Sequence, residues 1–152
     1  MRPFTVSIFA VVAGLATTAY AAGQSHGPAA PADTRETIVL TAGERAQLLA
    51  GMRAYLESIQ EIVDDLANNK TAQTAQPARR AGTKMLVDVS PTLAVKVPMG
   101  FMTMSLATHQ QFDQLADLAS KPGSRGEVLA LLSTIMANCT TCHASYRAIE
   151  GK

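Results

Sequence analysis

The 152-residue sequence has little cysteine, few aromatic residues and no excess of either charge. It contains two cysteines, no tryptophan and 5% aromatic residues, so a large apolar object at the centre of the fold need not be a side chain. Lys plus Arg number 13 and Asp plus Glu 12. This balance does not point to nucleic acid or to anionic lipid, and we predict neither partner. No acid–base pair, nucleophile or substrate motif stands out, so we do not predict an enzyme.

The N-terminus has the pattern of an export signal. Arg2 precedes an apolar run over residues 4–16, and residues 19–21, Ala-Tyr-Ala, form a small-x-small cleavage pattern. We predict a signal peptide over residues 1–21 that is cleaved near Ala21, with an uncleaved anchor as the alternative. The run is short for a membrane span, so we predict none in the mature, exported chain.

The rest of the chain divides into a lead-in and four helices. Residues 22–40 are rich in Ala, Pro and Gly, bury too little apolar surface to order themselves, and predict a flexible lead-in. Thr41 and Glu44 then form a capping-box pattern. Four helices with short loops predict an all-α, antiparallel up-down-up-down four-helix bundle over residues 41–152. Apolar periodicity and helix-breaking residues predict these helices over 41 to about 68, 76–88, 98–119 and 124 to about 149.

Both cysteines and one of the three histidines stand together near the C-terminus. Cys139, Cys142 and His143 form the pattern C-x-x-C-H within the stretch NCTTCHASYR. On a helix these three side chains project from one face. That arrangement suits a haem whose two vinyl groups take up the two thiols as thioethers, with the imidazole as a ligand of the iron. We therefore predict one covalently attached haem c.

Three other uses of the cysteine pair fit the sequence less well. A disulfide is favoured by export, but a bridge that closes so short a loop constrains little of the unfolded chain. A thioredoxin-like redox pair is expected at a helix start after a strand, whereas Cys139 lies near the end of the last predicted helix. A zinc site needs a fourth ligand, and the sequence has no second cysteine pair.

The geometry of the predicted bundle suggests the second ligand of the iron. The first and last helices are antiparallel, so at about 1.5 Å per residue Met52 and His143 fall at levels that differ by about the half-width of a haem. Met52 also lies on the inward stripe of its helix. We predict Met52 as the distal ligand. His109, at almost the same level on the helix of residues 98–119, is the alternative, and a site with no second protein ligand is another.

These features resemble the class II cytochromes c, the family of cytochrome c-prime and its low-spin relatives. The resemblance covers about residues 41–149 and implies a periplasmic four-helix bundle with one covalent haem near the C-terminus. In low-spin members a methionine of the first helix is the distal ligand, and Met52 matches it. The specific part of the likeness is a C-x-x-C-H-x-x-(aromatic)-Arg pattern that fits Cys139, Cys142, His143, Tyr146 and Arg147.

We predict a periplasmic electron carrier whose iron is six-coordinate, with His143 and Met52 as ligands, and which acts on redox partner proteins. The alternative is a gas-binding protein that resembles cytochrome c-prime and takes nitric oxide or carbon monoxide at an open or displaceable distal site. Arg147 is a candidate contact for a haem propionate, because guanidinium binds carboxylate in a bidentate manner. Homodimers are common among the proteins that the chain resembles, so the resemblance also implies a homodimer as one expected oligomeric state.

Overall fold

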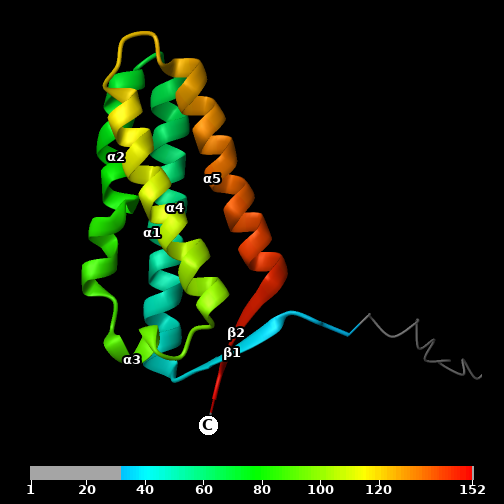
Figure 1. Ribbon diagram of the computed structural model, residues 1–152. Helices are drawn as coiled ribbons and strands as arrows, with labels where there is room; N and C mark the ends of the chain where they lie inside the picture. The colour runs from blue at the N-terminus through cyan, green and yellow to red at the C-terminus, as the bar shows by residue number, and fades with distance from the viewer. Residues whose placement is uncertain (1–31, 152) are drawn as a thin grey trace, which may run out of the picture. The chain divides into compact units, whose positions relative to one another are not determined.

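Helices make up most of the chain in the computed structural model, which describes residues 32–151 (Figure 1). The predicted signal peptide, residues 1–21, and the first part of the predicted lead-in, residues 22–31, lie outside the described residues. The prediction of a mainly helical chain is confirmed. The helices of the described part are α1 (Ala42–Ala67), α2 (Ala75–Ala81), α3 (Pro91–Ala94), α4 (Met99–Ala119) and α5 (Arg125–Ser145), with two 3-10 helices, η1 (Thr71–Thr74) and η2 (Thr83–Asp88).

Local sequence accounts for both ends of α1. Thr41 and Glu44 form the predicted capping box, in which the amide of Glu44 donates to Oγ1 of Thr41 at 3.3 Å and the amide of Thr41 donates to Oε2 of Glu44 at 2.8 Å. These bonds satisfy backbone donors that the first turn leaves without helical partners. Beyond Ala67, Asn69 takes a left-handed conformation with φ of 59°. Asparagine tolerates this conformation better than most residues, and it ends the helix.

The helix predicted over residues 76–88 is two shorter pieces, α2 and η2, which meet at Gly82. A Cβ atom on Gly82 would collide with the carboxylate of Asp113 on α4. The same carboxylate accepts hydrogen bonds from the amide and the hydroxyl of Thr83, at 3.0 and 2.7 Å. The break is therefore fixed by a tertiary contact with α4, which no local pattern in the sequence indicates.

A two-stranded parallel sheet corrects three predictions. Strand β1 (Glu36–Leu40) pairs in parallel with β2 (Tyr146–Glu150), first residue against first and last against last. Strand β1 occupies the end of the predicted flexible lead-in, α5 ends at Ser145 rather than near residue 149, and the chain is not wholly helical. Each strand has only five residues, and a short apolar run does not by itself distinguish a strand from the end of a helix.

Two apolar clusters lie at the two ends of α4. The larger packs the second halves of α1 and α4 against α2 and the first half of α5, and it fully buries Ile62, Phe112 and Ile135. The smaller joins β1 to α3 through Leu40 and Leu93. The larger cluster removes apolar side chains of these helix segments from water, and this burial is the main source of their stability.

Neighbouring helices pack in the order α1, α2, α4 and α5. The backbones of α2 and α4, and those of α4 and α5, approach closely, whereas α1 and α5 have little close contact. Figure 1 shows α5 diverging from α1 towards its C-terminal end, and the last fully buried residue of α5 is Ile135. The C-terminal half of α5 therefore contacts α4 but hardly touches α1.

Candidate functional site

One stripe of α5 runs from the apolar core into the cysteine pair. Its buried residues follow steps of four and three, and the two cysteines continue the same steps: Val128, Leu132, Ile135, Cys139 and Cys142. Side chains at these spacings lie on one face of a helix. The cysteines therefore point to the same side as the core, but they are only half-buried, because the packing ends before them.

Helix α5 is also apolar along most of its length. Residues 128–145 carry no Asp, Glu, Lys or Arg, and α5 is long and apolar enough to cross a membrane by length and composition alone. Core helices of soluble proteins meet the same criterion, so this property does not distinguish a membrane-spanning helix from a core helix.

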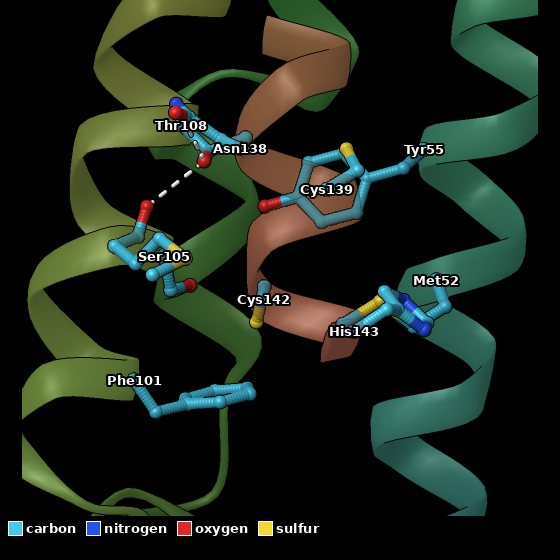
Figure 2. Close-up of a pocket in the computed structure, with 10 residues that line it drawn as sticks. Met52, Tyr55, Phe101, Ser105, Thr108, Asn138, Cys139, Cys142 and His143 are labelled. Carbon is cyan, nitrogen blue, oxygen red and sulfur yellow. Dashed lines mark hydrogen bonds between the residues drawn. The ribbon is translucent and has the colours of Figure 1, made fainter. Parts of the chain in front are cut away.

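A small cavity of about 50 Å³, open on one side, contains the motif (Figure 2). Its walls come from α1, α4 and α5, and the side chains on them are mainly thioether, thiol, aromatic and hydroxyl groups. Figure 2 shows Met52 and Tyr55 entering from α1, Phe101 and Ser105 from α4, and the cysteines from α5. The full lining is Met52, Tyr55, Phe101, Met104, Ser105, Thr108, Asn138, Cys139, Cys142 and His143.

A larger groove of about 760 Å³ adjoins this cavity. It lies among α1, η2, α3 and α4, and its walls are largely apolar, with several methionine, leucine and valine side chains. Met52, Tyr55, Phe101 and Ser105 line both spaces. The cavity that holds the cysteines therefore opens into a space large enough for a sizeable apolar ligand.

The two cysteines are free thiols. Sγ of Cys139 lies 3.4 Å from the carbonyl oxygen of Ile135, to which the thiol donates. Burial raises the pKa of both the Cys139 and the Cys142 thiol, so both groups are protonated at neutral pH in the free chain. The arrangement offers two uncharged thiols to one apolar cavity.

His143 and Met52 line the same cavity from different helices. His143 lies in the last turn of α5 and is exposed. No hydrogen bond engages its ring within residues 32–151, whereas its backbone carbonyl accepts one from Nη1 of Arg35 at 3.3 Å. Met52 is half-buried on α1. The structure thus brings together the two side chains that the sequence suggested as axial ligands, and leaves the imidazole nitrogens unengaged.

His109 occupies a different position. It is 4% exposed, and it lines the groove but not the cavity that holds the cysteines. Its Nδ1 lies 2.8 Å from the carbonyl oxygen of Ala81, and Nε2 lies 2.6 Å from the hydroxyl of Tyr55. Since a carbonyl only accepts, Nδ1 carries the hydrogen and Nε2 accepts from Tyr55. Desolvation lowers the pKa of His109. His109 is thus a satisfied core residue, and this arrangement favours Met52 over His109 as a ligand.

Arg147 lies on β2 rather than in the cavity. Its Nε donates to Oγ1 of Thr37 at 2.9 Å, and its Nη1 lies 3.7 Å from Oδ2 of Asp33. The guanidinium predicted to meet a haem propionate is therefore engaged by two groups of the N-terminal strand region. Its neighbour Tyr146 packs edge-on against Phe101, with ring centroids 5.6 Å apart.

The sequence analysis missed the polar groups of the cavity wall. Nδ2 of Asn138 donates to Oε1 of Gln111 at 2.7 Å and lies 3.4 Å from Oγ1 of Thr108. These contacts tie α5 to α4 directly beside Cys139. In the sequence, only the position of Asn138 next to the motif pointed to a role in the cavity wall. Its partners on α4 are brought to it by tertiary packing.

Comparison of the chain with protein-family models, with curated proteins and with solved structures finds no match. Within residues 32–151, no group of three or more His, Cys, Asp or Glu side chains is arranged to hold a metal ion.

Proposed function

We propose that this chain is a c-type cytochrome that carries electrons in the periplasm. One observation carries the proposal: both cysteines, the adjacent histidine and a methionine from a distant helix line a single cavity. In this proposal the helices form an antiparallel four-helix bundle, and one haem c fills the space that separates α5 from α1. The N-terminal export pattern supports the compartment, and the partners are redox proteins of that compartment.

The residues of the cavity fit a covalently bound haem. Cys139 and Cys142 would each add a thiol S–H across one vinyl group, which forms a thioether and consumes no further reactant. His143 would be the proximal ligand and Met52 the distal one. A porphyrin supplies four nitrogen ligands of its own, so the protein needs to offer only two. When bound, the haem supplies one-electron chemistry at its iron, with a potential raised by methionine ligation.

The side chains around these ligands suit a carrier. Phe101 and Tyr55 contribute aromatic rings to the cavity wall, and Met104 adds a flexible apolar side chain. An apolar shell excludes water and lowers the local dielectric constant, which is one of the means by which proteins set the potential of a haem. The two cysteines and both ligands lie on helices, which hold their positions better than loops do.

Expression of the full-length chain in a bacterial host with c-type haem maturation tests the proposal. We expect a red protein whose mass exceeds that of the processed polypeptide by one haem, and whose pyridine haemochrome spectrum is that of a haem with both vinyl groups saturated. The Cys139→Ala/Cys142→Ala variant should lose the covalent haem. Thr140→Ala is the matched control, because Thr140 lies between the cysteines and its hydroxyl only donates to the carbonyl of Ala137, at 2.9 Å. A colourless wild-type protein of polypeptide mass would contradict the proposal.

A gas-binding function is the second candidate, and the groove beside Met52 favours it. The groove would give a small ligand room on the side of the site where Met52 lies. In that case carbon monoxide should displace Met52 readily from the reduced protein and change its visible spectrum at once. A reduced spectrum that carbon monoxide leaves unchanged supports the carrier.

A further inference from the structure

The two helices that carry the proposed iron ligands hardly touch each other. Met52 lies on α1 and His143 on α5, and the backbones of these helices approach closely at few points. The packing joins α1 to α2 and α5 to α4, so the spacing across the cavity depends on two intermediate helices. The end of α5 also extends beyond its last fully buried residue, Ile135. Without another link, the end that carries His143 would be the least supported part of the site.

The two strands supply a direct link. β1 leads into α1, and β2 continues from α5, and the strands pair in parallel along their whole length. Ile38 and Leu40 of β1 are buried and pack with Leu93 of α3. The amide of Gly151 adds a hydrogen bond to the carbonyl of Leu40 at 2.8 Å. The start of α1 is therefore joined to the end of α5 by a backbone ladder with an apolar side.

Side chains of the N-terminal strand region also reach the motif itself. Nη1 of Arg35 donates to the carbonyl of His143 in the last turn of α5, where carbonyl groups lack helical partners and the helix dipole favours a cation. Asp33 holds Arg35 through bonds of 2.9 and 2.7 Å. On β2, Arg147 is bound by Thr37 and lies near the same Asp33. The strand pairing and these side chains therefore both hold the chain at the C-terminal end of α5, at His143 and in the strand that follows it.

We propose that residues 33–40 and 146–150 form a clasp that positions His143 against Met52, with Arg35 as a positioning residue. The inference rests on the proposed function, since it concerns residues that would hold the iron. No residue of the clasp lines either cavity. Opening the clasp leaves the thioethers intact, because both cysteines are on α5 itself. It frees the end of α5 to move away from α1, so that Met52 is displaced from the iron more easily.

The test compares Arg35→Ala, Arg35→Lys and Arg35→Ala/Arg147→Ala as full-length, haem-loaded proteins. All should carry one haem per chain. We expect the reduced Arg35→Ala protein to bind carbon monoxide about two- to five-fold faster than wild type, the size that follows from the small net contribution of a solvent-exposed contact to a charged group. The double variant should bind faster still, and Arg35→Lys should recover part of the wild-type rate. The near-infrared band of methionine-ligated ferric haem should weaken in the same order.

Arg80→Ala is the matched control. The Arg80 side chain is 45% exposed, against 40% for Arg35, and it forms an ion pair with Glu61 away from the cavity. It should leave both the carbon monoxide rate and the band unchanged. If Arg35→Ala behaves as wild type, or if Arg80→Ala changes as much, the clasp does not position the ligands, although haem attachment still stands. A wild-type chain that takes up no haem contradicts the proposed function instead.

Discussion

The hydroxyl of Tyr55 lies 2.6 Å from Nε2 of His109, and this contact gives His109 a role unlike that of the other histidine in the described chain. The Nδ1 hydrogen of His109 is already donated to the carbonyl of Ala81, at 2.8 Å. Both ring nitrogens of His109 are therefore occupied, whereas no hydrogen bond within residues 32–151 engages the ring of His143. The two histidines differ in what they can still bind.

Met52→Ala should convert the haem-loaded protein from a low-spin to a high-spin spectrum. The substitution removes the thioether that we propose as distal ligand. Visible and near-infrared spectra of the oxidised protein, and carbon monoxide binding to the reduced one, provide the measurement.

Two variants serve as controls for that prediction. Met104→Ala removes a methionine from the same cavity and should keep the low-spin spectrum. His109→Ala should also keep it, at a cost in stability. If His109→Ala produced the high-spin spectrum and Met52→Ala did not, the assignment of the distal ligand would be wrong.

Tyr55→Phe should destabilise the chain by about 1–3 kcal/mol, because Nε2 of His109 loses its donor while it stays buried. The stacking of the ring on Phe112, with centroids 5.6 Å apart, is retained. Denaturant unfolding followed by circular dichroism measures the difference. Tyr146→Phe is the control: its ring also packs on an aromatic neighbour, Phe101, and its hydroxyl makes no hydrogen bond within the described residues. It should change stability by no more than about 0.5 kcal/mol.

The stability of the chain should fall below pH 6.5 through His109. Burial lowers the pKa of His109 from its ordinary value of 6.5, so in this range the unfolded chain binds a proton that the folded chain does not. The contribution of neutral His109 is complete above the unfolded pKa and is lost as the pH falls towards the folded one.

As the pH falls below about 6.5, unfolding free energies should therefore fall more steeply in wild type than in His109→Gln. Acidic groups that are held ionised titrate lower: the hydrogen bond from Lys96, with that from the Thr41 amide, lowers the pKa of Glu44 from 4.5 to about 2. Equal slopes for the two proteins in this interval would exclude His109 as the source.

Gly82→Ala and Gly43→Ala should act in opposite directions. At Gly82 a methyl group displaces the Asp113 carboxylate from Thr83, so we expect a loss of about 1–3 kcal/mol. At Gly43, in the first turn of α1, a Cβ meets nothing within 4 Å, and alanine should stabilise the helix by about 0.5–1 kcal/mol. Thermal or denaturant unfolding of both variants measures the two changes. A neutral Gly82→Ala would show that the Asp113 carboxylate moves freely.

Local patterns predicted α1 and α4 well, because each has a strong signal at its ends and a long apolar stripe between them. The capping box of Thr41 and Glu44 fixed the start of α1, and Pro98 precedes the first residue of α4. The spacing of Cys139 and Cys142 also predicted their common direction, since both continue the buried stripe of α5. These features depend on residues within a few turns of one another, which is the range over which helical periodicity acts.

Tertiary packing decided what depends on distant partners. The parallel pairing of β1 with β2, the break at Gly82 and the engagement of Arg147 by Thr37 each join segments far apart in the chain. The sequence by itself determined the helical character of the chain, the motif and its face on α5, since these follow from neighbouring residues. Only the fold decided that Met52 shares the cavity of the motif while His109 is held by Tyr55, because helix periodicity gives the face of a residue but not the partner it meets.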